Sequence, residues 1–219
     1  MKFLKQIFKK PADKTPVQQN ADRPFGSTDE EIKQFFLDWG QAIISDATMT
    51  IHNYPFAPSI VFGGKTFGAS DIKSIDLESA PPTLQIGNEL IFISAEHKDK
   101  LKQFTTQNKI PTIQQPPIWS WILEPFLDTE FTSEHELRLN NLLAQYGLTE
   151  SEIAAIRNRV REQMMKYNFD TMLWNWTDFN AIDVLFAMRP KLTESEFKDF
   201  YAEVMKIALL PPEHRSISH

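Results

Sequence analysis

Cysteine is absent from this chain of 219 residues, which excludes disulfide bonds, thiolate catalysis and cysteine metal sites. No apolar run approaches the roughly 20 residues that a transmembrane helix needs. The first ten residues, MKFLKQIFKK, begin like a signal peptide, but Lys5, Gln6 and Lys9 interrupt the apolar stretch of about 7–15 residues that such a peptide requires. We therefore expect a cytoplasmic protein.

Recognisable catalytic, metal and nucleotide motifs are also missing. The five histidines are scattered along the chain, and Glu134-His135-Glu136 lacks the second histidine of a zinc-protease motif. No nucleophile elbow, phosphate-binding loop or dinucleotide fingerprint occurs. We therefore expect no catalytic residue, no metal and no cofactor, although paired carboxylates such as Asp178 and Asp183 keep a carboxylate-dependent hydrolase as an alternative.

Glycine is scarce in the second half, because six of the seven glycines lie before residue 115. Short β-like segments fill residues 47–95, and from Ile118 onward the pattern is helical. This change predicts an α+β protein: a small N-terminal unit with an antiparallel sheet and flanking helices, then an all-α helical bundle. The expected divisions are a leader and linker at 1–28, an α/β unit at 29–113 and a helical unit at 118–219.

Charge is unevenly distributed. Residues 1–28 carry six basic and two acidic side chains (+4), residues 29–117 carry seven and eleven (−4), and residues 118–219 carry ten and sixteen (−6). The body outside the leader is therefore acidic, which disfavours nucleic acid and suits a basic protein partner.

The leader has the pattern of a basic amphipathic helix. Its apolar residues share one helical face and lysines occupy much of the rest; the apolar four are Phe3, Leu4, Ile7 and Phe8. Such a helix can lie on an anionic membrane surface, in a partner's groove or on the protein's own acidic body. Residues 11–28 read as a linker, and membrane contact would be weak.

The α/β unit opens with a capping box at Thr28, which predicts a helix with an apolar stripe ending near Trp39 or running on past Gly40. Ser94 is expected to cap a later helix that buries Leu101 and Phe104. Five strands are predicted, with a hairpin turn at Gly87-Asn88: Thr48–His52, Ser59–Phe62, Ile72–Leu77, Thr83–Ile86 and Glu89–Ser94.

Within residues 47–110, the spacing of Ile72, Ile75 and Leu77, followed by a hairpin and a helix, resembles the latter half of a bacterial pleckstrin-homology-like domain. That resemblance implies a scaffold that binds peptides or lipid headgroups. Phosphoinositide binding would need a cluster of basic residues, and the only candidates at the expected strand and loop positions are Lys65 and Lys73.

Capping boxes beginning at Ser133, Thr149 and Thr193 predict three helix starts in the second unit. The last two lie in identical pentapeptides, LTESE at 148–152 and 192–196, which indicate either a repeat or two coincident helix starts. After Thr149, three arginines are expected on an exposed side, either as an anion-binding strip or paired with nearby carboxylates; these are Arg157, Arg159 and Arg161.

Four tryptophans form two Trp-x-Trp pairs. On a helix the two rings of a pair point about 200° apart, so one faces the core and the other faces a neighbouring element or solvent. The four tryptophans either pack between helices or, together with nearby acids, contact a basic partner. The candidate binding residues are Trp119, Trp121, Trp174, Trp176, Asp178 and Asp183.

The leading hypothesis is a non-enzymatic protein-binding module of the bacterial cytoplasm. One version is an immunity or antitoxin-like protein that occludes a basic partner, because complementary charge speeds capture and tryptophan anchors supply affinity. The alternatives are a hydrolase that uses carboxylates between the two units, and a peripheral membrane adaptor that uses the basic N-terminal helix.

Overall fold

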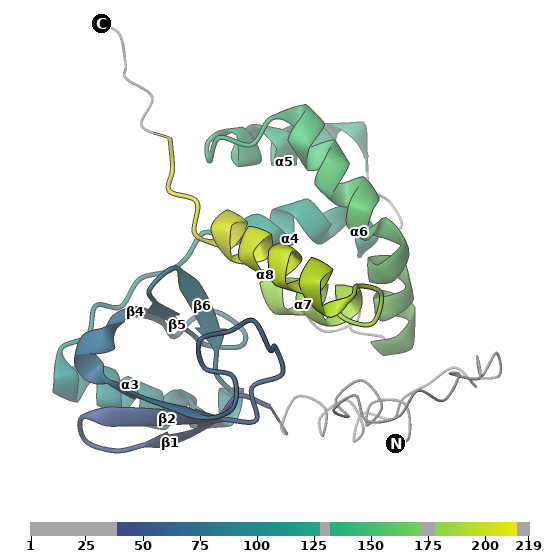
Figure 1. The fold of residues 1–219 in the computed structure, drawn as a ribbon. Helices are drawn as coiled ribbons and strands as arrows, with labels where there is room; N and C mark the ends of the chain where they lie inside the picture. The colour runs from purple at the N-terminus through teal and green to yellow at the C-terminus, as the bar shows by residue number, and fades with distance from the viewer. Residues whose placement is uncertain (1–38, 128–131, 172–177, 214–219) are drawn as a thin grey trace, which may run out of the picture.

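The computed structural model describes residues 39–127, 132–171 and 178–213. Strands and one helix occupy residues 41–108, and the further helices pack beside them over residues 118–208 (Figure 1). The predicted α+β class is confirmed. The predicted helix that begins at Thr28, and the leader residues Phe3, Leu4, Ile7 and Phe8, lie outside the described residues.

The described strands form two antiparallel sheets of three strands each. The first sheet contains β1 (Gln41–Ile44), β2 (Thr48–His52) and β3 (Lys65–Gly68). The second contains β4 (Ile72–Asp76), β5 (Thr83–Ile86) and β6 (Glu89–Phe92), and is followed by helix α3 (Lys98–Asn108). A strand, a hairpin and a helix therefore occur in the predicted order.

The predicted hairpin is confirmed. Strands β5 and β6 pair with Ile86 opposite Glu89, and Gly87 has a φ of +59°. A positive φ at the first position of a two-residue loop is the pattern of a type II′ turn, and glycine adopts it without steric cost.

One predicted strand is wrong, and two strands were not predicted. Of the two alternatives at Gly40, the helical extension does not occur, because Gly40 turns the chain with a φ of +63° and Gln41–Ile44 then forms β1, which pairs with β2. The segment at Ser59–Phe62 forms turns closed by the Ser59 carbonyl, which accepts from the Phe62 amide at 3.1 Å. Strand β3 was missed, since its four residues contain only one buried apolar side chain, Phe67.

The helical part contains α4 (Ile118–Leu123), α5 (Ser133–Ala144), α6 (Glu150–Thr171), α7 (Ala181–Met188) and α8 (Glu194–Ala208). Short 3-10 segments occur at Ala69–Asp71, Ala95–His97 and Glu124–Phe126. Among the described residues, no helix has both the length and the apolar character to cross a membrane.

The predicted helix starts at Thr149 and Thr193 are confirmed. In each case the threonine Oγ1 accepts from the backbone amide three residues on, at 3.3 Å, and the glutamate at that position accepts from the threonine amide at 2.9 Å. For α5 the cap is Thr132 and not Ser133. Ser94 precedes the 3-10 turn at Ala95–His97 without a capping side-chain bond, whereas Leu101 and Phe104 are buried as predicted.

The buried residues of the sheets and the helices form one continuous core. Strand β6 lies against α8, where the Leu90 amide faces the Met205 sulfur at 3.4 Å. The connector after α3 covers the free edge of β4, because the Ile75 amide donates to Pro111 at 2.9 Å and the Ile113 amide donates to Ile75 at 3.0 Å. The second sheet is therefore held at β6 by α8 and at β4 by the connector. These contacts fix the walls of the cleft described next.

Candidate binding cleft

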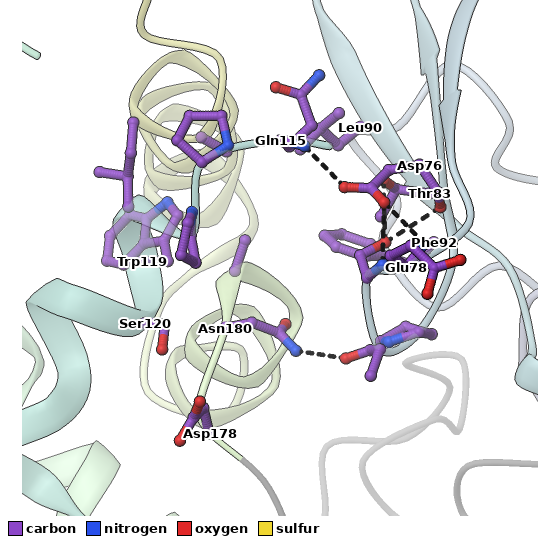
Figure 2. Close-up of a pocket in the computed structure, with 18 of the residues that line it drawn as sticks. Asp76, Glu78, Thr83, Leu90, Phe92, Gln115, Trp119, Ser120, Asp178 and Asn180 are labelled. Carbon is purple, nitrogen blue, oxygen red and sulfur yellow. Dashed lines mark hydrogen bonds between the residues drawn. The ribbon is translucent and has the colours of Figure 1, made fainter. Parts of the chain in front are cut away.

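A cleft of about 390 Å³ lies where the second sheet meets the ends of α4, α7 and α8 (Figure 2). This volume falls near the lower end of the range of about 300–1,000 Å³ for ligand sites. Its apolar floor comes from both parts of the chain: Leu90, Phe92, Ile118, Trp119, Phe179 and Ala208. The residues that line the cleft therefore lie far apart in the sequence and meet only in the folded chain.

Trp119 is held in place from the helical side. Its ring is 3% exposed, and the indole Nε1 donates to the carbonyl of Val204 on α8 at 3.0 Å. A buried indole N–H usually needs such a partner, so the bond fixes the ring against α8. Trp119 thus gives the floor of the cleft a ring that cannot turn freely.

Asn180 links the two walls of the cleft. Its Oδ1 accepts from the Ile182 amide at 2.9 Å and thereby caps α7, while its Nδ2 donates to the carbonyl of Ala80 at 2.8 Å (Figure 2). A single side chain therefore ties the start of α7 to the loop between β4 and β5.

Asp76 organises the opposite wall. Its Oδ1 accepts from the amides of Glu78 and Ser79 at 2.9 and 3.0 Å, and its Oδ2 accepts from the amide of Gln115 at 2.8 Å (Figure 2). The side chain is 3% exposed. Because both carboxylate oxygens already accept backbone hydrogen bonds, Asp76 holds the loop and the connector together.

The charge of the cleft has one sign. Three acids line it, Asp76, Glu78 and Asp178, and no lysine, arginine or histidine is among its described lining residues. Glu78 and Asp178 are exposed, and the Lys98 ammonium lies 3.8 Å from the Glu78 carboxylate. Such an exposed pair is worth little, so the rim remains attractive to cations.

Two of the predicted binding residues, Trp119 and Asp178, are brought together in this cleft. Trp121 lies elsewhere: its ring is half-buried and packs 5.7 Å from the ring of Tyr146. One ring of this pair therefore faces the core and the other a neighbouring element, as expected for a helix. Trp174 and Trp176 lie outside the described residues.

Asp183, the other acid among the candidate binding residues, is not among the residues that line the cleft. It is buried as the third residue of α7, where its Oδ2 accepts from the Asn180 amide at 2.8 Å and its Oδ1 from the Tyr167 hydroxyl at 3.0 Å. Burial raises the pKa of Asp183 from 3.8 to about 6, because the charged form loses its hydration. Asp183 therefore supports the helix behind the cleft.

The exposure expected for the three arginines is wrong for Arg157, which pairs with Glu136 at 3.4 Å. Arg157 is buried, and its guanidinium donates to the carbonyls of Ile122 and Trp121 at 3.1 and 3.3 Å. These carbonyls end α4 and lack partners within that helix. Arg159 pairs with Glu203 and lies over the ring of Phe200, while Arg161 is exposed.

Sequence reasoning missed Asp76, Glu78, Gln115 and Asn180 as lining residues. Asn180 carried a usable signal, since an Asn-x-x-Asp sequence before an apolar run favours a helix start. Among the described residues, no group of three or more metal-ligating side chains occurs.

Protonation of Asp183 should stabilise the fold at low pH. Because its pKa is higher in the folded protein than in the unfolded chain, this contribution is complete below about pH 4 and is lost as the pH rises through about 6. Asp183→Asn should therefore gain stability relative to the native chain as the pH rises, by roughly 3 kcal/mol at most. Urea unfolding of both proteins across this range, with Asp178→Asn as the exposed control, measures the effect. A pH-independent difference would contradict it.

A search for matching protein-family models, curated proteins and solved structures finds none that matches this chain.

Proposed function

We propose that this chain is a non-enzymatic, cytoplasmic protein-binding module whose cleft receives a basic segment of a protein partner. The observation that carries the proposal is an apolar, aromatic floor below an acidic rim without a basic lining residue in the described chain. An aliphatic stem or ring on the partner would cover Phe92 and Trp119, and its cationic groups would lie beside Glu78 and Asp178.

The character of the carboxylates favours binding over hydrolysis. Asp76 is the one buried acid among the described lining residues, and its two oxygens accept three backbone hydrogen bonds. A general acid or base needs a free oxygen within reach of the substrate proton. The other two acids, Glu78 and Asp178, are exposed at the rim, where they suit electrostatic capture.

A narrower version of the proposal is an immunity or antitoxin-like protein that occludes a basic enzyme. The acidic body supports this version, because residues 29–219 carry a formal net charge of about −10. The proposed capture would be fast and sensitive to salt.

The test uses isothermal titration of the full chain with a synthetic amphipathic peptide that contains lysine, leucine and phenylalanine. A counterpart with glutamate in place of lysine serves as the peptide control. We expect only the lysine peptide to bind, and the double variant Glu78→Gln/Asp178→Asn should weaken it by roughly three- to tenfold and reduce its salt dependence.

The matched control is the double variant Glu134→Gln/Asp199→Asn, which removes the same charge from exposed positions. Asp199 lies nine residues from the lining residue Ala208, or about 13.5 Å along α8. This control should leave the affinity within about twofold. Equal binding of both peptides, or equal losses in both double variants, would contradict the proposal.

A further inference from the structure

The described chain begins beside the cleft. The ring of Trp39 packs 5.8 Å from that of Phe186 on α7, the helix whose first residue, Ala181, lines the cleft. The next residue, Gly40, lies so close to β6 that a Cβ there would approach the carbonyl oxygen of Phe92 to 2.8 Å. Phe92 also lines the cleft, so the first described residues lie beside one residue of its lining.

The leader complements the cleft in both charge and polarity. Lys2, Lys5, Lys9 and Lys10 give residues 1–10 a charge of +4, whereas the charged groups of the described lining are all acidic. The apolar face of the leader consists of Phe3, Leu4, Ile7 and Phe8, and the floor of the cleft is aromatic and aliphatic. With a volume of about 390 Å³, near the lower end of the range for ligand sites, the cleft suits a few side chains and not a whole helix.

The connection between them is long enough. Residues 11–28 have the proline-containing, polar composition of a linker, and even a Gly-rich coil of 18 residues would have an r.m.s. reach of about 20–25 Å. The predicted helix over residues 29–39 would add about 16 Å. A linker of this length keeps a tethered segment at an effective concentration of about millimolar, so even a weak ligand would occupy the site.

We propose that residues 1–10 dock on this cleft as an amphipathic helix and compete with the basic partner. Side chains of the apolar face enter the cleft, and the lysines lie beside Glu78 and Asp178. A helix of ten residues is marginal in water, so its helicity depends on this contact. The inference rests on the proposed function, because the leader occupies the site assigned there to the partner and thereby sets the affinity that a partner must exceed.

The absence of cysteine allows a direct test, because one introduced cysteine provides a unique labelling site. A nitroxide on Ser120→Cys, at the cleft, should broaden the amide NMR signals of residues 2–10 in the full chain at low salt. The same label on Glu134→Cys, which is exposed on α5, is the control and should leave those signals sharp. Glu78→Gln/Asp178→Asn should reduce the broadening seen from Ser120→Cys.

Competition gives the second measurement. Deletion of residues 1–10 should strengthen binding of the lysine-containing probe peptide by at least threefold, because the cleft is then vacant. Lys5→Glu/Lys9→Glu in the full chain should act in the same direction, since both changes remove attraction between the leader and the rim. Replacement of Lys14 and Arg23 in the linker by glutamate is the matched control and should have the smaller effect.

A failure of the docking proposal can be distinguished from a failure of the proposed function. If the shortened chain binds the probe through Glu78 and Asp178, but the deletion leaves the affinity unchanged and the leader signals stay sharp, the docking proposal is overturned and the proposed function stands. If neither the full nor the shortened chain binds the probe, the proposed function fails. Broadening of residues 2–10 from Ser120→Cys would in that case still establish docking of the leader.

Discussion

Phe56→Ala is expected to lower the free energy of unfolding by about 3–5 kcal/mol, the usual cost of removing a fully buried aromatic ring. Phe56 has no solvent exposure, and its ring lies 5.0 Å from that of Phe186, 6.0 Å from that of Phe197 and 5.9 Å from that of Tyr201. It follows β2, whereas its three partners lie on α7 and α8. The ring therefore joins the strands to the helices at the centre of the shared core.

The matched control is Phe62→Ala, because Phe62 is 52% exposed and lies in the same connection between β2 and β3. The same chemical change there should cost less than about 1 kcal/mol. Guanidinium unfolding followed by far-UV and near-UV circular dichroism measures both variants. Equal losses in the two variants, or separate transitions for strands and helices in the native chain, would contradict a single cooperative core.

Asp76→Ala is expected to lower the free energy of unfolding by about 3–4 kcal/mol. The substitution leaves the amides of Glu78, Ser79 and Gln115 without their charged acceptor, and an unsatisfied buried donor costs about 1–3 kcal/mol, less where water reaches it. Because Gln115 belongs to the connector, the variant also loosens one wall of the cleft.

Asp76→Asn distinguishes the contributions of the two carboxylate oxygens to stability. An asparagine oxygen can still accept from Glu78 and Ser79, whereas its amide nitrogen cannot accept from Gln115, so the loss should be about half as large. Asp71→Ala, which removes one exposed bond to the Gly68 amide, should cost less than either. Urea unfolding ranks the three variants, and a loss for Asp76→Ala no greater than that for Asp71→Ala would contradict the assigned role.

Features that depend on neighbours in the chain were predicted well. The turn at Gly87 and the caps at Thr149 and Thr193 involve hydrogen bonds or φ values within a few residues, so the local sequence is sufficient. The burial of Leu101 and Phe104 followed from helical spacing alone.

Features that depend on distant partners were missed. Gln41–Ile44 continues a helical apolar pattern, yet it becomes a strand because β2 pairs with it and because the Ala42 amide faces Nε2 of His97 at 3.2 Å. Arg157 looks like a surface residue of α6, yet the end of α4 supplies carbonyls that satisfy its guanidinium. Helical spacing identifies a face but not the helix that will cover it.

The sequence by itself determined the α+β class, the local turns and caps, and an acidic body with a basic leader. These follow from composition and from interactions between residues close in the chain. Only the tertiary structure decided that Trp119 and Asp178 share a cleft with Asp76 and Glu78, while Trp121, Asp183 and Arg157 serve packing. The reason is physical: the walls of the cleft come from segments about 100 residues apart, joined by contacts such as that of Asn180 with Ala80.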